Sequence, residues 1–204
     1  LRRRLQLIGL PGGNANDHQR RIYNRPLLEA LKEGRVRRLD LLRVEWGNAV
    51  RYAHSYVGLG LSSHAAREIN RQHASRRKQA LAALRSLWHF TPALVRYGGK
   101  RYTYDNLVIA NIDMMARYLH LAKDSQPDDG ICEVITVRHR NKLQLLQTIL
   151  LALMRVSPEI RRKKQVSFTT LRPLTMQLDG EIQHLPEGER ITVRVKHRVL
   201  RTLR

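Results

Sequence analysis

The C-terminal part of the sequence contains strand-like segments that follow one another after short turns, and this constrains the fold more than any other feature. Alternating or β-branched segments predict strands over 165–170, 175–178, 181–184 and 191–199. Strands in direct succession pair antiparallel, whereas a doubly wound parallel sheet needs a helix between each pair of strands. The region therefore predicts an architecture dominated by a β-sandwich.

The upstream sequence adds strands and a few helices to this pattern. Strands are expected over 37–44, 50–61, 104–111 and 131–137, and helices over 65–70, 78–97 and 143–154. A short apolar run, 5–10, precedes a glycine turn and a helix start, which is an α/β signature. We therefore predict an α+β protein. Residues 1–34 would be the remnant of a nucleotide-binding α/β domain, and residues 35–204 a β-sandwich-type domain.

The chain is strongly basic, with 38 Lys and Arg residues against 17 Asp and Glu residues and a formal charge of +21. Such a charge attracts polyanions, either nucleic acid or the anionic face of a membrane. The basic residues are dispersed along the chain, and aromatic residues make up only 5%, too few for an obvious base-stacking platform. An arginine-rich nucleic-acid-binding protein is one interpretation, and ordinary solvated faces are another.

Hydropathy and cysteine content indicate the cellular compartment in which the protein is expected. The longest apolar stretch, 143–154, still contains Gln144 and Gln147, so the sequence predicts no membrane-spanning helix. A single cysteine, Cys132, forbids an internal disulfide and is consistent with a reducing compartment. We therefore expect a cytoplasmic protein.

Clustered carboxylates are informative in so basic a chain. Asp124, Asp128 and Asp129 lie close together in the sequence and are followed by Gly130. Carboxylates at this spacing repel one another, and a bound cation would relieve the repulsion. Pro-Asp-Asp-Gly is also a good turn sequence without any ligand. The spacing alone leaves a metal site and an acidic surface turn both open.

A second acidic site is Asp179-Gly180-Glu181, between two predicted strands. Asp-Gly is a strong signal for a hairpin turn, which is the simpler interpretation. A carboxylate fixed at the corner of a rigid sheet is also what a general base for a hydroxyl nucleophile requires.

The glycine turn near the start of the chain has some features of a phosphate-binding loop. Residues 11–17 follow a predicted strand and open a helix, where backbone N–H groups can hold a phosphate. The loop is neither a Walker loop nor G-x-G-x-x-G, so by itself it predicts little.

Five short segments together form a more specific pattern: 11–17 (PGGNAND), 57–61 (VGLGL), 107–111 (LVIAN), 121–131 (LAKDSQPDDGI) and 178–181 (LDGE). In this order they resemble the diacylglycerol-kinase catalytic-domain family, which includes soluble bacterial lipid kinases and sphingosine kinases. The likeness corresponds to the C-terminal portion of that family.

The resemblance implies roles for individual residues. Asp129 would supply the side-chain ligand of a Mg²⁺ site, with backbone carbonyls from Gln126 and Ile131. Asp179 would accept the proton of a lipid hydroxyl. The residues implied on the nucleotide side are Asn14, Asn16, Asp17 and, beside the phosphates, Glu181.

The implied reaction is transfer of the γ-phosphate of ATP to a lipid alcohol, with Mg²⁺ as cofactor. The family's G-G-D-G-T phosphate loop is absent, so we expect this chain to be part of a longer kinase. Its expected partners are ATP, a lipid alcohol and the anionic inner surface of a membrane, which it would contact peripherally. Self-association is left open. The alternatives are a nucleic-acid-binding protein and a non-catalytic lipid-binding relative.

Overall fold

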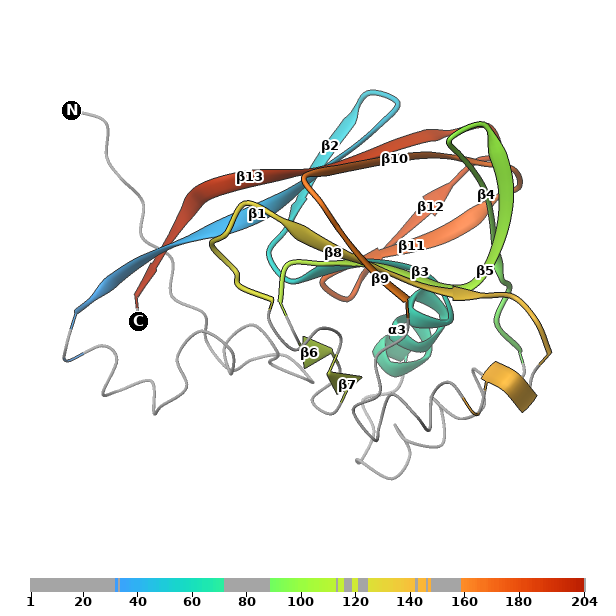
Figure 1. The fold of residues 1–204 in the computed structure, drawn as a ribbon, viewed down its shortest axis with the longest axis horizontal. Coiled ribbons are helices and arrows are strands. Elements are labelled where there is room, and N and C mark those ends of the chain that lie inside the picture. The colour runs from blue at the N-terminus through green and yellow to red at the C-terminus, as the bar shows by residue number, and fades with distance from the viewer. Residues whose placement is uncertain are drawn as a thin grey trace.

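The computed structural model describes residue 32 and residues 34–71, 89–112, 114–115, 119–120, 125–141, 143–145, 147 and 159–203. Within these ranges the chain forms a large antiparallel sheet of eleven strands, a two-stranded ribbon and the helix α3 (Figure 1). No helix of this described part is both long and apolar enough to cross a membrane.

The main sheet runs in the order β12-β11-β3-β5-β4-β10-β13-β1-β2, and β8 and β9 branch from β5. Its strands are β1 (Val36–Trp46), β2 (Ala49–Ala53), β3 (Tyr56–Gly60), β4 (Ala93–Tyr97), β5 (Lys100–Ala110), β8 (Cys132–Arg138), β9 (Glu159–Lys163), β10 (Gln165–Thr170), β11 (Leu174–Leu178), β12 (Glu181–Leu185) and β13 (Arg190–Leu203). The separate ribbon consists of β6 (Met114–Met115) and β7 (Leu119–His120).

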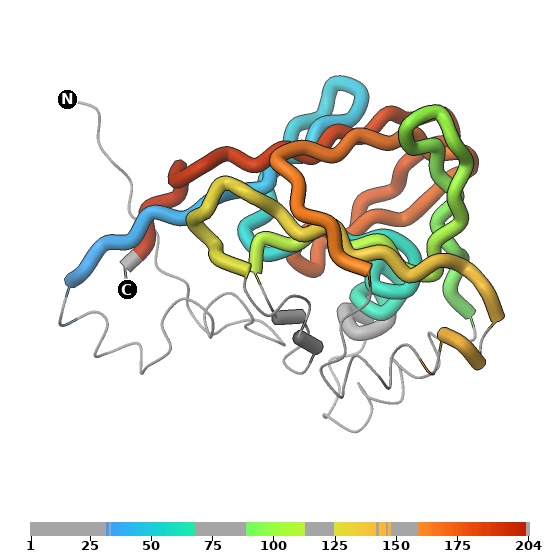
Figure 2. Tube along the Cα trace, in the orientation of Figure 1, coloured from blue at the N-terminus to red at the C-terminus, as the bar shows by residue number. Residues whose placement is uncertain are grey.

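The sheet curls on itself, so that β10 and β13 lie across a shared core from β5 and β8 (Figures 1 and 2). Fully buried side chains from opposite walls meet in one cluster, for example Val193 of β13 and Ile109 of β5. Helix α3 (Leu61–Arg71) follows β3 directly and packs against β3, β5 and β11. The described buried side chains of α3 are Ser62 and Ser63, whose hydroxyls donate to the carbonyls of Leu59 and Gly60 and fix the start of the helix.

The structure confirms the β-dominated architecture and most of the predicted strands. The segments 37–44, 104–111 and 131–137 correspond to β1, β5 and β8, and the four C-terminal segments correspond to β10, β11, β12 and β13. The helix predicted over 65–70 lies within α3. The predicted nucleotide-binding remnant, residues 1–34, and most of the helix predicted over 143–154 lie outside the described residues.

Two predictions of local structure are wrong, and one strand was missed. The helix predicted over 78–97 does not extend to Tyr97, because 93–97 form β4, whose Ala93 and Val95 alternate into the core. The strand predicted over 50–61 is broken at His54 and Ser55, between β2 and β3. Strand β9 was not predicted, because an exposed edge strand of mostly charged residues has no apolar alternation.

Gly60 allows β3 and β5 to approach closely at the start of α3. It has φ +78, and a Cβ atom there would lie 2.4 Å from the backbone oxygen of Asp105. Gly188 has nearly the same φ, +79, with nothing near its missing Cβ.

We therefore expect Gly60→Ala to lower the free energy of unfolding by about 3 kcal/mol or more, which combines left-handed strain with a backbone clash. Gly188→Ala is the matched control and should cost only the strain, about 1 kcal/mol. Urea unfolding of both variants measures the difference. Equal losses would contradict the close approach of the two strands.

Candidate phosphoryl-transfer site

Asp179 and Gly180 form the two-residue turn between β11 and β12. Both have positive φ, 50 and 98, as a type I′ hairpin turn requires. The buried side-chain oxygen of Gln177 accepts a hydrogen bond from the N–H of Gly180 at 2.8 Å and fixes the turn. The hairpin interpretation of Asp-Gly is therefore confirmed.

The same turn directs the Asp179 carboxylate at the break between β2 and β3. Its Oδ1 accepts the backbone N–H groups of Ser55 and Tyr56, both at 2.9 Å, and its Oδ2 accepts that of His54 at 2.7 Å. Three backbone donors hold the carboxylate in one orientation and compensate its charge. This carboxylate is therefore rigidly placed, as a group that acts on a substrate must be.

His54 lies beside this carboxylate. Its Nε2 is 3.5 Å from Oδ2 of Asp179, and its Nδ1 is 2.7 Å from the hydroxyl of Ser55. The imidazole is 44% exposed and the carboxylate 16%. An imidazole in this position can take up or release a proton next to the carboxylate.

Asp179 and Glu181 line one pocket of about 290 Å³. Its walls come from the β2–β3 break and the β11–β12 hairpin, and they are formed by Arg51, Tyr52, His54, Leu178, Asp179, Glu181 and Gln183. The structure thus brings together two of the carboxylates singled out from the sequence. A pocket of this size approaches the range of small-ligand sites.

The two aspartates of the acidic turn, residues 125–130, make different contacts. Asp128 accepts two hydrogen bonds from the guanidinium of Arg37, at 2.9 and 3.2 Å. Asp129 is exposed, and its Oδ1 accepts the N–H of Ile131 at 2.9 Å. Asp129 does not line the Asp179 pocket, and the described residues contain no group of three potential metal-ligating side chains. Asp129, Asp179 and Glu181 therefore do not form one direct cluster among the described residues.

Asp40 anchors the acidic turn to the sheet. It lies at a bulge, where the β1–β13 register shifts between Leu39 and Leu41, and it is fully buried. Its Oδ2 accepts the N–H of Gly130 at 2.6 Å, and its Oδ1 accepts that of Arg198 at 2.6 Å and lies 3.0 Å from Nδ1 of His197. The backbone N–H of Asp40 in turn donates to the carbonyl of Pro127 at 2.7 Å.

Asn111 links Asp40 to the Asp179 pocket. Its side-chain Nδ2 donates to the backbone oxygens of Asp40 and His54, both at 3.1 Å, and its N–H donates to the carbonyl of Ser55 at 2.7 Å. The acidic turn and the Asp179 carboxylate are therefore joined by a continuous series of hydrogen bonds through buried groups. Such a network keeps the two turns in a fixed relation.

Sequence reasoning missed Asp40, Asn111 and His54 as site residues. Asp40 gave a signal, since it is an acid within the apolar run of β1. Asn111 was identified from the sequence only as the last residue of the segment 107–111. The predicted nucleotide-side residues Asn14, Asn16 and Asp17, and Asp124, which precedes the acidic turn, lie outside the described residues.

Two ionisable groups next to the acidic turn are buried rather than reactive. Burial raises the pKa of the Cys132 thiol to about 12, so it carries no thiolate at neutral pH. Burial also raises the pKa of Glu133, whose Oε2 accepts a hydrogen bond from the Ser125 hydroxyl at 2.7 Å. Oε1 of Glu133 has no hydrogen-bond partner among the described residues, but it lies 3.5 Å from Nε of Arg162 in an ion pair.

The raised pKa of Glu133 predicts a pH-dependent stability. The folded protein holds this proton more tightly than the unfolded chain, so stability falls as the pH rises from the unfolded pKa, about 4.3, through the folded value. Glu133→Gln should therefore stabilise the protein at pH 8 and have little effect at pH 3.5. Urea unfolding at both pH values measures this. A variant that is less stable than the wild type at pH 8 would contradict it.

The fold is shared with solved bacterial proteins from Bacillus anthracis str. Sterne. A diacylglycerol kinase superimposes with a TM-score of 0.66 and 15% identity, covering 95% of this chain and 67% of its own. A protein assigned as a diacylglycerol kinase has a TM-score of 0.70 and 16% identity, covering 100% of this chain and 69% of its own. The sequence matches no curated protein.

A family model gives the sequence-level evidence. Residues 55–201, most of the chain, match the model of the YegS C-terminal NAD kinase beta sandwich-like domain. The match begins at Ser55, within the β2–β3 break, and includes Asn111, the acidic turn and the β11–β12 hairpin. The resemblance to the C-terminal portion of bacterial diacylglycerol-kinase-like proteins is thereby confirmed. The chain belongs to the YegS family through this beta-sandwich domain.

Proposed function

We propose that this chain is the lipid-binding and catalytic-base portion of an ATP- and Mg²⁺-dependent lipid kinase. The observation that carries the proposal is the Asp179 carboxylate, held by three backbone N–H groups at the wall of a pocket that also contains His54 and Glu181. The names of the similar structures, diacylglycerol kinases, support the choice of reaction.

The chemistry proposed for the pocket is proton removal from a lipid hydroxyl. Asp179 accepts the proton as the hydroxyl oxygen bonds to the γ-phosphorus of ATP and the bond from that phosphorus to the β,γ-bridging oxygen breaks, releasing ADP. His54, next to Oδ2, then receives the proton on its way to solvent. We assign Glu181 to the nucleotide phosphates, and Asn14, Asn16 and Asp17 to nucleotide binding, because the family resemblance implies these roles.

The acidic turn has a donor set that suits Mg²⁺. Asp129 is exposed, and its Oδ1 accepts the N–H of Ile131. Gln126 and Ile131 would add backbone carbonyls, as the family resemblance implies. Mg²⁺ binds such sites through one or two carboxylates and retains several waters. The ion would neutralise phosphate charge during transfer.

Asp129→Ala should raise the Mg²⁺ concentration needed for half-maximal activity by about tenfold or more, because it removes the side-chain ligand. Asp128→Ala is the adjacent control, which removes the pair with Arg37 but no proposed ligand. A magnesium titration of initial rates compares them. The same magnesium requirement in both variants would mean that the acidic turn is only a turn.

The positive charge of the chain, +21, fits an enzyme whose substrate resides in an anionic membrane. Each basic residue near such a surface contributes on the order of 1 kcal/mol of attraction. We propose that the protein is cytoplasmic and contacts the membrane peripherally.

The proposed function is tested by incubating the full-length gene product with γ-³²P-labelled ATP, Mg²⁺ and vesicles that contain diacylglycerol, a sphingoid base or phosphatidylglycerol. Label in the organic extract, at the mobility of the phosphorylated lipid, is the expected result. Vesicle binding without labelled lipid would instead indicate a non-catalytic lipid-binding relative. Binding to nucleic acid with a steep salt dependence, and none to vesicles, would indicate the other alternative.

A further inference from the structure

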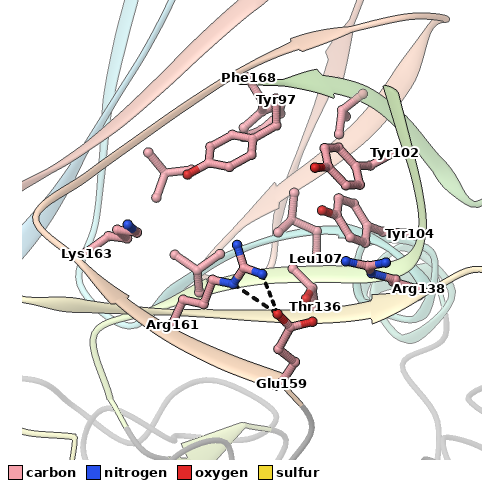
Figure 3. Close-up of a pocket in the computed structure, with 13 residues that line it drawn as sticks. Tyr97, Tyr102, Tyr104, Leu107, Thr136, Arg138, Glu159, Arg161, Lys163 and Phe168 are labelled. Carbon is pink, nitrogen blue, oxygen red and sulfur yellow. Dashed lines mark hydrogen bonds and ion pairs between the residues drawn. The ribbon is translucent and has the colours of Figure 1, made fainter. Parts of the chain in front are cut away.

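The curled sheet contains a second cavity, which shares no lining residue with the Asp179 pocket. It lies where β9 and β10 separate, since β9 pairs with β8 while β10 pairs with β4 and β13 (Figure 3). Its volume is about 50 Å³. A cavity of this volume has room for about four water molecules, which is too little for an acyl chain.

One wall of the cavity is aromatic. Tyr102 and Tyr104 stack with ring centroids 5.7 Å apart and planes at 7°, and Tyr97 meets Tyr102 edge-on at 6.5 Å. The hydroxyls of Tyr102 and Tyr104 point to the same side, into the cavity (Figure 3). Burial raises the pKa of Tyr104, so its hydroxyl remains a hydrogen-bond donor at neutral pH. Two phenolic donors thus face the cavity.

Basic side chains line the cavity on both sides. Arg138 lies on the tyrosine side, with its guanidinium 5.9 Å from the ring centroid of Tyr102. Arg161 and Lys163 come from β9, together with a single carboxylate, that of Glu159. Glu159 binds Nε and Nη2 of Arg161, at 3.0 and 2.6 Å, and this leaves Nη1 of Arg161 for another partner. Three cations and one carboxylate give the cavity two net positive charges. An anion that enters it meets both charge and hydroxyl donors.

We propose that this cavity binds one phosphate group, carried by a phospholipid whose chains stay outside. A phosphate has four acceptor oxygens in a compact tetrahedron, which matches the cavity's size and its set of guanidinium, ammonium and phenolic donors. The choice of a phospholipid over free phosphate rests on the proposed function, whereas the phosphate chemistry rests on the cavity alone. Such a contact would hold the β8–β9 edge against an anionic membrane.

Protection of an exposed sheet edge is the simpler explanation for the charges of β9. It accounts for charged side chains along β9, such as Arg162 and Lys163. It does not account for the tyrosine hydroxyls, which come from β5 and face the same cavity. The tyrosines therefore distinguish the two explanations.

The test measures binding of the chain to phosphatidylcholine vesicles that contain phosphatidic acid, an exposed phosphomonoester, by co-sedimentation. Vesicles with oleic acid at equal surface charge are the carboxylate comparison. Tyr102→Phe/Tyr104→Phe removes two donors without changing charge or volume, and should weaken binding to phosphatidic acid about tenfold or more. The double variant should bind oleic acid vesicles as the wild type does.

A second set of variants tests the contribution of the basic side chains that line the cavity. Arg161→Gln/Lys163→Gln should weaken binding to phosphatidic acid about 25-fold, whereas Arg190→Gln/Lys196→Gln on β13, outside both pockets, should change it at most a few-fold. Lys163→Gln alone, at an exposed side chain, keeps the test valid if the double variant does not fold. Vesicle binding is measured without ATP and needs no turnover, so failure of the kinase proposal would not affect this result.

Three outcomes would overturn the inference. The first is equal binding of wild type and tyrosine variant to phosphatidic acid vesicles. The second is equal loss from the cavity and β13 charge variants, which would indicate attraction by overall charge. The third is saturation by inorganic phosphate without vesicle binding, which would indicate a site for free phosphate rather than lipid.

Discussion

Replacing Asp179 with Asn is expected to lower kcat for lipid phosphorylation by about 10²–10⁴, the usual contribution of a positioned general base. The amide oxygen can still accept the N–H groups of Ser55 and Tyr56, but it is too weak a base to remove the hydroxyl proton. The amide nitrogen would face the N–H of His54, so a modest loss of stability is also expected. ATP affinity should be unchanged, because the change removes no phosphate contact.

Glu181→Gln is the matched control, since it neutralises the other carboxylate of the same pocket. Its effect should appear in KM for ATP rather than in kcat. Initial rates over a range of ATP concentrations, together with equilibrium ATP binding, separate the two variants. Turnover by Asp179→Asn near the wild-type rate would contradict the assignment of Asp179 as the base.

Replacing Asp40 with Ala should lower the free energy of unfolding by about 3–5 kcal/mol, the range found when one partner of a buried charged network is removed. The substitution leaves the N–H groups of Gly130 and Arg198 without their acceptor and removes the partner of His197. It should also raise the magnesium requirement, because Asp40 holds the turn that carries Asp129.

Asp128→Ala is the comparison for stability. It removes a partly exposed ion pair with Arg37, which contributes at most about 1 kcal/mol. Urea unfolding of the two variants, followed by magnesium titration of those that fold, gives both readouts. Equal destabilisation by the two substitutions would mean that the buried Asp40 network does not hold the acidic turn.

The local sequence was sufficient to predict those parts of the site that form from residues adjacent in the chain. Asp179-Gly180 predicts a hairpin turn because only a few residue types accept two successive positive φ values. Asp179 can be both a turn residue and a candidate base, because the conformation that closes the hairpin also directs its carboxylate at the β2–β3 break.

The rest of the site depends on contacts between distant segments. Asp40 meets Gly130 and Arg198 only because β1 pairs with β13 through a bulge and the acidic turn folds against it. Asn111 joins two turns that are far apart in the sequence. Neither contact has a periodic or motif signal, so a single sequence cannot reveal it. Strand β9 was also not predicted. Its charged side chains reflect its position at the edge of the sheet, and the local sequence does not reveal that position.

The central claim is that the acidic turn and the Asp179 pocket, joined through Asp40 and Asn111, serve one phosphoryl-transfer site. Mn²⁺ binds the carboxylate sites that Mg²⁺ uses and broadens NMR signals near it. The most direct test is therefore titration of the ¹⁵N-labelled protein with Mn²⁺ in the presence of ADP. The account predicts joint broadening of the amide signals of Gly130, Ser55 and Tyr56, which Asp129→Ala abolishes. Broadening of Gly130 alone, with Ser55 and Tyr56 unaffected at saturation, would contradict it.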